Sequence, residues 1–146
     1  MPAQFDAFGI QFLYPENWKT VQREEGEGDQ GVTFDLPSGG FVSIEQTRSV
    51  SEEELIGRIV DAISEEYDEL EQERVHLDVL PEEMAATDFR FYYLDLLIVS
   101  RVVVVPAMDV PGDDTMLVIQ IQAESRDFDE NEVVFAAILK QILDAR

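Results

Sequence analysis

The sequence predicts an α+β sandwich, in which two main helices cover one antiparallel sheet of about six to eight strands. The first observation behind this prediction is a series of short segments with alternating apolar and polar residues, typical of half-buried strands. The second is that the turns between successive strands are short, which favours antiparallel pairing. The third is a pair of longer segments with apolar residues at helical spacing. The chain of 146 residues contains no repeat or linker, so we expect a single domain over residues 1–146.

The first half of the chain contains four predicted strands. They cover residues 9–14, 18–23, 32–36 and 41–47. Pro15 ends the first of them, because proline presets the backbone for a turn. The stretch "FLYPENW" places Trp18, the only tryptophan, directly after this turn. We expect its ring to pack over the sheet edge and fix the corner, with recognition of a partner at the surface as the alternative.

The first helix is predicted to begin after Ser51. Ser51 and Glu54 have the spacing of a capping box, and apolar residues then follow helical spacing as far as Leu70. We therefore expect this helix to end within residues 70–73. Its outer face is acidic and includes Glu65, Glu66, Asp68 and Glu69.

The second half of the chain again contains strands followed by a helix. The strands are predicted at residues 74–79, 88–93, 96–105 and 116–124. Phe89, Phe91 and Tyr93 share one face of their strand, which we expect to pack in the core under a helix. Tyr92 lies on the opposite face and is the candidate for an exposed aromatic patch.

The segment "DFDENE" begins the last predicted helix. We expect Asp129 and Glu132 to cap it, because acidic residues are favourable at the positive end of the helix dipole. The same segment matches the first three ligand positions of an EF-hand calcium loop, but Glu132 and Ile138 stand where that loop needs Gly and Glu. A helix cap explains these residues better, and weak calcium binding here or in "MDVPGDD" is the alternative.

The strongest compositional feature is a net charge of −22, from 32 acidic residues against 10 Lys and Arg. A field of this sign repels nucleic acid and anionic membranes, so we expect neither as a partner. It favours a basic protein partner, although a solvated acidic surface is also typical of soluble or salt-adapted proteins. The N-terminus shows no secretory signal, and no apolar run could cross a bilayer, so we expect a cytoplasmic protein.

The residue types needed for common catalytic and metal sites are scarce. The chain has no cysteine and one histidine, His76, which we expect to face solvent. This composition argues against disulfides, zinc sites and a Cys-His nucleophile. The stretch "GEGDQG" precedes a strand and carries acids, so it lacks the context that dinucleotide binding requires. We therefore predict a protein that is not an enzyme, with no catalytic residues, no cofactor and no metal.

These observations predict a non-catalytic, soluble acidic binding module or specialised chaperone that recognises a protein partner. We expect apolar anchors and acidic contacts at Trp18, Tyr92, Glu52, Glu53, Glu65, Glu66 and Asp68. Binding through such charges should weaken as the salt concentration rises. The alternative is a small-ligand-binding protein or a carboxylate-based enzyme with a pocket between sheet and helix. Both a monomer and a homodimer are compatible with a sheet that has two open edges.

The order of these elements resembles the PsbP-like superfamily. The resemblance rests on the corner "FLYPENW", the strand pair "PSGGFVSI", the helix start "SEEEL" and the final helix, and it spans Ile10 to Leu143. This superfamily includes the photosystem II extrinsic protein PsbP, the Ran-binding Mog protein and many bacterial proteins of unknown role. One bacterial branch looks like chaperones for type VI secretion effectors. The resemblance implies an α-β-α sandwich and a non-enzymatic protein that binds another protein.

Overall fold

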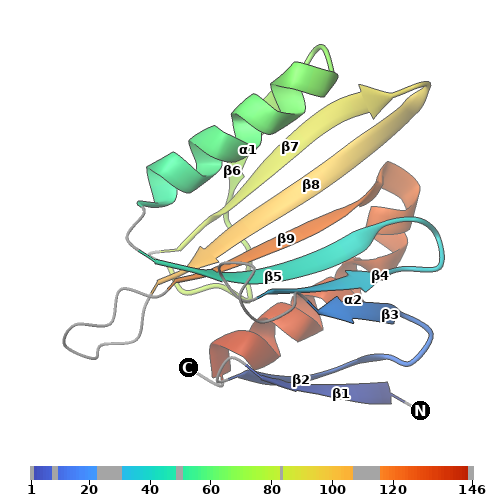
Figure 1. Ribbon diagram of the computed structural model, residues 1–146, viewed down its shortest axis with the longest axis vertical. Helices are drawn as coiled ribbons and strands as arrows, with labels where there is room; N and C mark the ends of the chain where they lie inside the picture. The colour runs from blue at the N-terminus through green and yellow to red at the C-terminus, as the bar shows by residue number, and fades with distance from the viewer. Residues whose placement is uncertain are drawn as a thin grey trace.

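The protein folds as a seven-stranded antiparallel sheet with two helices and a separate two-stranded hairpin (Figure 1). The computed structural model describes residues 2–7, 10–22, 31–48, 51–82, 84–106 and 116–144. Its strands are β1 (Pro2–Ala7), β2 (Ile10–Pro15), β3 (Lys19–Gln22), β4 (Gly31–Asp35), β5 (Phe41–Thr47), β6 (Glu71–Val75), β7 (Ala86–Tyr93), β8 (Leu96–Val105) and β9 (Met116–Glu124). Its helices are α1 (Glu52–Glu66) and α2 (Ser125–Asp144). The prediction of an α+β fold built on an antiparallel sheet is confirmed.

The strands of the large sheet follow the order β3-β4-β5-β9-β8-β7-β6, and each neighbouring pair is antiparallel. The two longest strands, β8 and β9, therefore lie inside the sheet with both edges paired. Helix α1 carries the chain from β5 to β6 at the far edge of the sheet (Figure 1). This crossover brings α1 alongside the β7–β8 hairpin.

The two helices cover opposite faces of the sheet. Side chains alternate between the two faces of a strand, and on β8 Val102 belongs to an apolar cluster with α1 while Val103 belongs to one with α2. The first cluster also contains Leu55, Ile63, Phe89 and Phe91, and the second contains Ile119, Phe135 and Ile138. Strand β8 is apolar almost throughout because both of its faces are covered. The prediction that Phe89 and Phe91 pack under a helix is confirmed.

The β1–β2 hairpin adds to the core on the side of α2. Phe5 and Phe12 both contact Phe34 of β4, with ring centroids 5.5 and 5.6 Å apart. The backbone N–H of Leu13 donates a hydrogen bond of 2.9 Å to Oε1 of Gln141 on α2. The sequence pattern does not predict β1, because "PAQFDA" carries one large apolar side chain and no clear alternation.

Helix α1 ends earlier than its apolar spacing predicts. Ser51 accepts a 3.1 Å hydrogen bond from the N–H of Glu54, so the predicted start is confirmed. The last helical residue is Glu66, because Tyr67 adopts an extended backbone with φ −130° and ψ 141°. The ring of Tyr67 then stacks on Phe91 of β7. The predicted end at residues 70–73 is therefore wrong, and β6 begins earlier than predicted.

Helix α2 follows β9 without an intervening loop. Oε2 of Glu124 accepts a 3.1 Å hydrogen bond from the N–H of Arg126 and satisfies one free N–H group at the helix start. Asp129 and Glu132 lie inside the helix, so the prediction that they cap it is wrong. Neither helix in the described residues is long and apolar enough to cross a membrane.

Candidate functional site

The β7–β8 hairpin ends in a cluster of exposed apolar side chains. Of the seven large hydrophobic residues exposed in the described part of the chain, four lie here. Their exposed fractions are 54% for Tyr92, 51% for Tyr93, 81% for Leu94 and 49% for Leu96. We call these four residues the tip patch. Single exposed hydrophobic residues are ordinary, but a contiguous group of them marks an interaction site.

The tip patch extends beyond the neighbouring strands. The pairing of β6 with β7 stops at Glu71 and Arg90, and the pairing of β9 with β8 stops at Glu124 and Ile98. Further toward the turn, β7 and β8 pair only with each other within the described residues, up to the pair of Tyr93 and Leu96. Figure 1 shows this end of the hairpin reaching past the start of α2, beside the C-terminal end of α1.

The C-terminal end of α1 supports one side of the hairpin. The ring of Tyr67 stacks on Phe91 at 4.6 Å and meets Tyr93 edge-on at 6.0 Å. Exposed carboxylates flank this tyrosine on both sides, at Glu65, Glu66, Asp68 and Glu69. Tyr93 is half exposed at the edge of this contact, so the prediction that it packs in the core with the two phenylalanines is wrong.

These carboxylates lie where the helix disfavours them. The C-terminal end of a helix carries partial negative charge, so each nearby acidic side chain costs about 0.3–1 kcal/mol. The last turn of α1 contains no basic residue that would offset Glu65 and Glu66. The acidic end of α1, which we define as Glu65, Glu66 and Asp68, is therefore unfavourable for the helix itself.

The backbone is strained at the same end of the molecule. Leu94 has φ 55° and Glu69 has φ 59°, and they are the non-glycine residues with positive φ in the described part of the chain. Leu94 is the first residue of the two-residue hairpin turn, a position with positive φ that glycine prefers. A leucine there costs about 1–2 kcal/mol. A leucine at position 94 is favoured neither by its backbone conformation nor by burial of its side chain. Residues with a strained backbone cluster at functional sites.

The structure brings together four of the seven predicted binding residues. Tyr92 belongs to the tip patch, and Glu65, Glu66 and Asp68 form the acidic end of α1 beside it. Glu52 and Glu53 lie at the other end of α1, about 20 Å away along the helix axis. Their carboxylates are favoured by the helix dipole there. A single compact site at the tip therefore leaves these two residues out.

Trp18 lies in the core. It is 6% exposed, and its ring packs against Phe135 of α2 with centroids 6.2 Å apart. Its backbone N–H donates a 3.1 Å hydrogen bond to the carbonyl of Pro15, which closes the turn. The prediction that Trp18 fixes the corner is confirmed. An exposed anchor at Trp18 is wrong, because α2 covers the ring.

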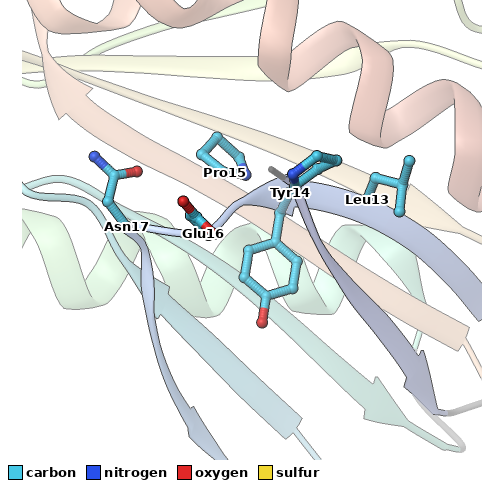
Figure 2. Close-up of a pocket in the computed structure, with 6 residues that line it drawn as sticks. Leu13, Tyr14, Pro15, Glu16 and Asn17 are labelled. Carbon is cyan, nitrogen blue, oxygen red and sulfur yellow. The ribbon is translucent and has the colours of Figure 1, made fainter.

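The outer side of the same corner carries a shallow hollow. Its volume is about 610 Å³, and it is lined by Pro2, Leu13, Tyr14, Pro15, Glu16 and Asn17. Figure 2 shows the ring of Tyr14 pointing away from Pro15, and this ring packs against Phe34 at 4.8 Å. Ligand sites usually combine apolar walls with converging polar groups. The labelled side chains do not converge in this way, so the corner is the weaker candidate (Figure 2).

Two further hollows lie between sheet and helix, where the alternative function would need a pocket. One of about 530 Å³ lies between α1 and β6 and is lined by Glu52, Glu53, Asp61 and Arg74 among others. The other, of about 360 Å³, lies against α2 and is lined by His76, Arg101 and Glu132 among others. His76 is exposed, as predicted. A ligand in either hollow stays a prediction.

Arg101, which lines the second hollow, forms a buried ion pair with Asp88. Nε and Nη2 of Arg101 donate hydrogen bonds of 2.8 and 2.9 Å to the two carboxylate oxygens of Asp88. Nη1 of Arg101 lies 3.6 Å from Glu132, and the guanidinium lies over the ring of Phe128. Burial alone would lower the pKa of Arg101, but its hydrogen bonds and the charges of Asp88 and Glu132 raise it.

This pair is absent from the predicted site, although the sequence contains a signal for it. Arg101 interrupts the apolar run "LLIVSRVVVV", and a charge in a buried strand requires an opposite charge nearby. Asp88 lies directly across from it on β7. Arg90 extends the network, with Nη2 at 3.9 Å from Asp88 and Nη1 at 3.0 Å from Glu73. The carboxylates and guanidinium groups here already have charged partners.

The absence of a metal stays a prediction, and "DFDEN" is the calcium candidate that lies within the described residues. Residues 127–131 of "DFDEN" lie within α2, and Nδ2 of Asn131 donates a 2.9 Å hydrogen bond to the carbonyl of Asp127. This segment is a helix rather than a calcium-binding loop. No group of three or more His, Asp or Glu residues in the described part of the chain could hold a metal ion. Asp109, Asp113 and Asp114, and residues 26–30 of "GEGDQG", lie outside it.

Comparison with known protein families and with curated proteins assigns no function to the tip patch. No model of a known protein family matches the chain, and no curated protein matches it in a sequence search. The resemblance to the PsbP-like superfamily therefore stays a prediction.

Proposed function

We propose that this protein is a non-catalytic binding module, acting in the cytoplasm as a specialised chaperone or adaptor, that captures a basic protein partner. The tip patch would supply the apolar anchor, and the acidic end of α1 would meet basic side chains on the partner. One observation carries the proposal: exposed Tyr93 and Leu94 protrude beside carboxylates that the helix itself disfavours.

The two parts of the site have different physical roles. Apolar anchors buried at the centre of an interface provide most of the affinity, whereas charges at its rim raise the association rate and set specificity. The tip patch offers roughly 400 Å², since a fully buried aromatic side chain contributes about 150–250 Å². A standard interface buries about 800 Å² on each partner. We therefore expect a transient complex that needs both parts.

The first test is affinity capture from a lysate of the native host, with the wild-type protein and two variants as baits. Leu94→Ser removes an apolar side chain that is 81% exposed at the tip, and Val133→Ser removes one that is 82% exposed on α2. We expect Val133→Ser to retain the partner and Leu94→Ser to lose it. Loss with both variants, or with neither, would count against a site at the tip.

The second test compares the two ends of α1. The double variant Glu65→Gln/Glu66→Gln and its control Glu52→Gln/Glu53→Gln remove the same charge from opposite ends of one helix. We expect only the first to weaken capture at low salt. At about 1 M salt, where charges are screened beyond about 3 Å, both variants and the wild type should bind equally weakly. Salt-independent capture would contradict the role of the carboxylates.

A further inference from the structure

Tyr92 and Tyr93 lie on opposite faces of the protruding hairpin. Tyr93 pairs with Leu96 across the ribbon and contacts Tyr67 of α1, which places it on the α1 side. Because successive side chains alternate between the faces of a strand, Tyr92 and its partner Leu97 lie on the α2 side. Both tyrosines are about half exposed, at 54% and 51%. The apolar surface therefore wraps around the end of the ribbon.

This arrangement restricts the shape of the partner. A flat surface could cover either tyrosine but would leave the other in water. Only a concave surface buries both rings and Leu94 at the turn between them. We propose that the tip patch is a wedge that enters a cleft in the partner protein, an inference that rests on the proposed function. A single β-layer occupies about 10 Å, so the cleft is about that wide.

The charges around the wedge differ between its two sides. The α1 side carries the exposed carboxylates of Glu65, Glu66 and Asp68. On the α2 side, Arg90 lies across from the exposed Glu71 on β6 and forms an ion pair with Glu73 at 3.0 Å, so one of the two carboxylates is offset by a guanidinium. The α1 side is therefore the more acidic of the two, and the wall of the cleft that faces α1 is the more basic wall. This asymmetry favours entry of the hairpin in one orientation over the other.

Two other partners that could cover the tip patch fit the observations less well. A lipid surface would bury the tip, but anionic bilayers repel a chain with a net charge of −22. A second copy of this chain would bring two acidic helix ends together, and like charges across an interface are unfavourable. A basic cleft in a different protein satisfies both the apolar surface and the carboxylates.

Photo-crosslinking tests the wedge directly. The photoreactive residue p-benzoylphenylalanine replaces Tyr92 in one bait and Tyr93 in another, and each is irradiated in the native host's lysate. We expect both positions to crosslink to the same protein, at two segments that form opposite walls of a cleft. Crosslinks from one position only would show a one-sided contact and overturn the wedge, and crosslinks to a second copy of this chain would do the same.

Side-chain removal distinguishes failure of the wedge from failure of the proposed function. Tyr92→Ser and Tyr93→Ser should each reduce the recovered partner by about tenfold, because both rings act as buried anchors. Full retention with Tyr92→Ser and loss with Tyr93→Ser would overturn the wedge and leave the binding module standing. Full retention with both variants would overturn both inferences. Thermal unfolding of each variant provides the control that the fold is intact.

Discussion

The Trp18 corner and the tip patch are both turns with aromatic residues at the ends of strands, yet only the corner buries its aromatic ring. Trp18 is 6% exposed and Tyr92 is 54% exposed. At the corner, α2 supplies a covering layer through Phe135, whereas the tip extends past Glu71, the first residue of β6, and Glu124, the last residue of β9. Burial at a turn therefore depends on layers from distant parts of the chain, and an aromatic residue left uncovered is available to a partner.

The largest effect is expected at the corner. Trp18→Ala removes a buried ring that packs on Phe135, so it should lower the free energy of unfolding by about 3–5 kcal/mol. Denaturant titration of wild type and variant measures this difference. A loss below about 1 kcal/mol would mean that the corner tolerates a cavity. Burial would then not make substitutions at the corner more destabilising than those at the tip.

If burial rather than residue type decides how much a substitution destabilises the fold, then breaking a buried ion pair should lower the free energy of unfolding about as much as removing a buried ring. Asp88→Asn keeps the side-chain volume but leaves Arg101 without its bidentate partner. We expect a loss of about 3 kcal/mol, at the low end for a broken buried pair because Glu132 still lies near Arg101. Thermal unfolding of this variant beside Asp129→Asn, an exposed control on α2, checks the expectation. Equal stability of the two variants would show that the pair contributes nothing.

At the tip, one substitution should stabilise the fold. Leu94→Gly relieves the strain of φ 55°, which outweighs the extra freedom that glycine gives the unfolded chain. We expect the free energy of unfolding to rise by about 0.5 kcal/mol while partner binding is lost. Leu96→Gly is the matched control, since Leu96 lies in the strand without positive φ and should lose stability. A destabilised Leu94→Gly protein would argue that the leucine serves folding.

The smallest effect on stability is expected for Tyr92. Tyr92→Ala removes a ring that is 54% exposed, and surface substitutions usually change the free energy of unfolding by less than about 0.5 kcal/mol. Denaturant titration beside Trp18→Ala then compares the two regions directly. If Tyr92→Ala lowered the free energy of unfolding about as much as Trp18→Ala, the expected difference between corner and tip would be wrong.

The sequence predicts best those elements whose pattern is strong by itself. The predicted bounds of β5, β8 and β9 are confirmed, because alternation or β-branched residues continue to their ends. The end of α1 is not predictable from spacing, since Tyr67 leaves the helix to stack on Phe91 of a distant strand. Tertiary packing decides this boundary over local propensity.

The candidate site also contains some features that the sequence predicts and others that it does not. Tyr92 and the carboxylates at the end of α1 can be named from the sequence, but their proximity depends on the contact of Tyr67 with Tyr93. The positive φ of Leu94 cannot be predicted from the sequence, because the two turn residues, Leu94 and Asp95, do not include the glycine that is typical of this conformation. The sequence therefore identifies several components of the site, and the fold determines how they lie relative to one another.

The ion pair of Asp88 and Arg101 has a consequence for how this protein can change over evolution. A slip of one residue between β7 and β8 would exchange the faces of Tyr92 and Tyr93, because side chains alternate along a strand. Such a slip would also separate two buried charges that lie opposite each other, which is strongly unfavourable. The alignment of the hairpin is thus fixed several residues away from its end. Residues at the end are free to diverge and to acquire new partners without loss of the strand register.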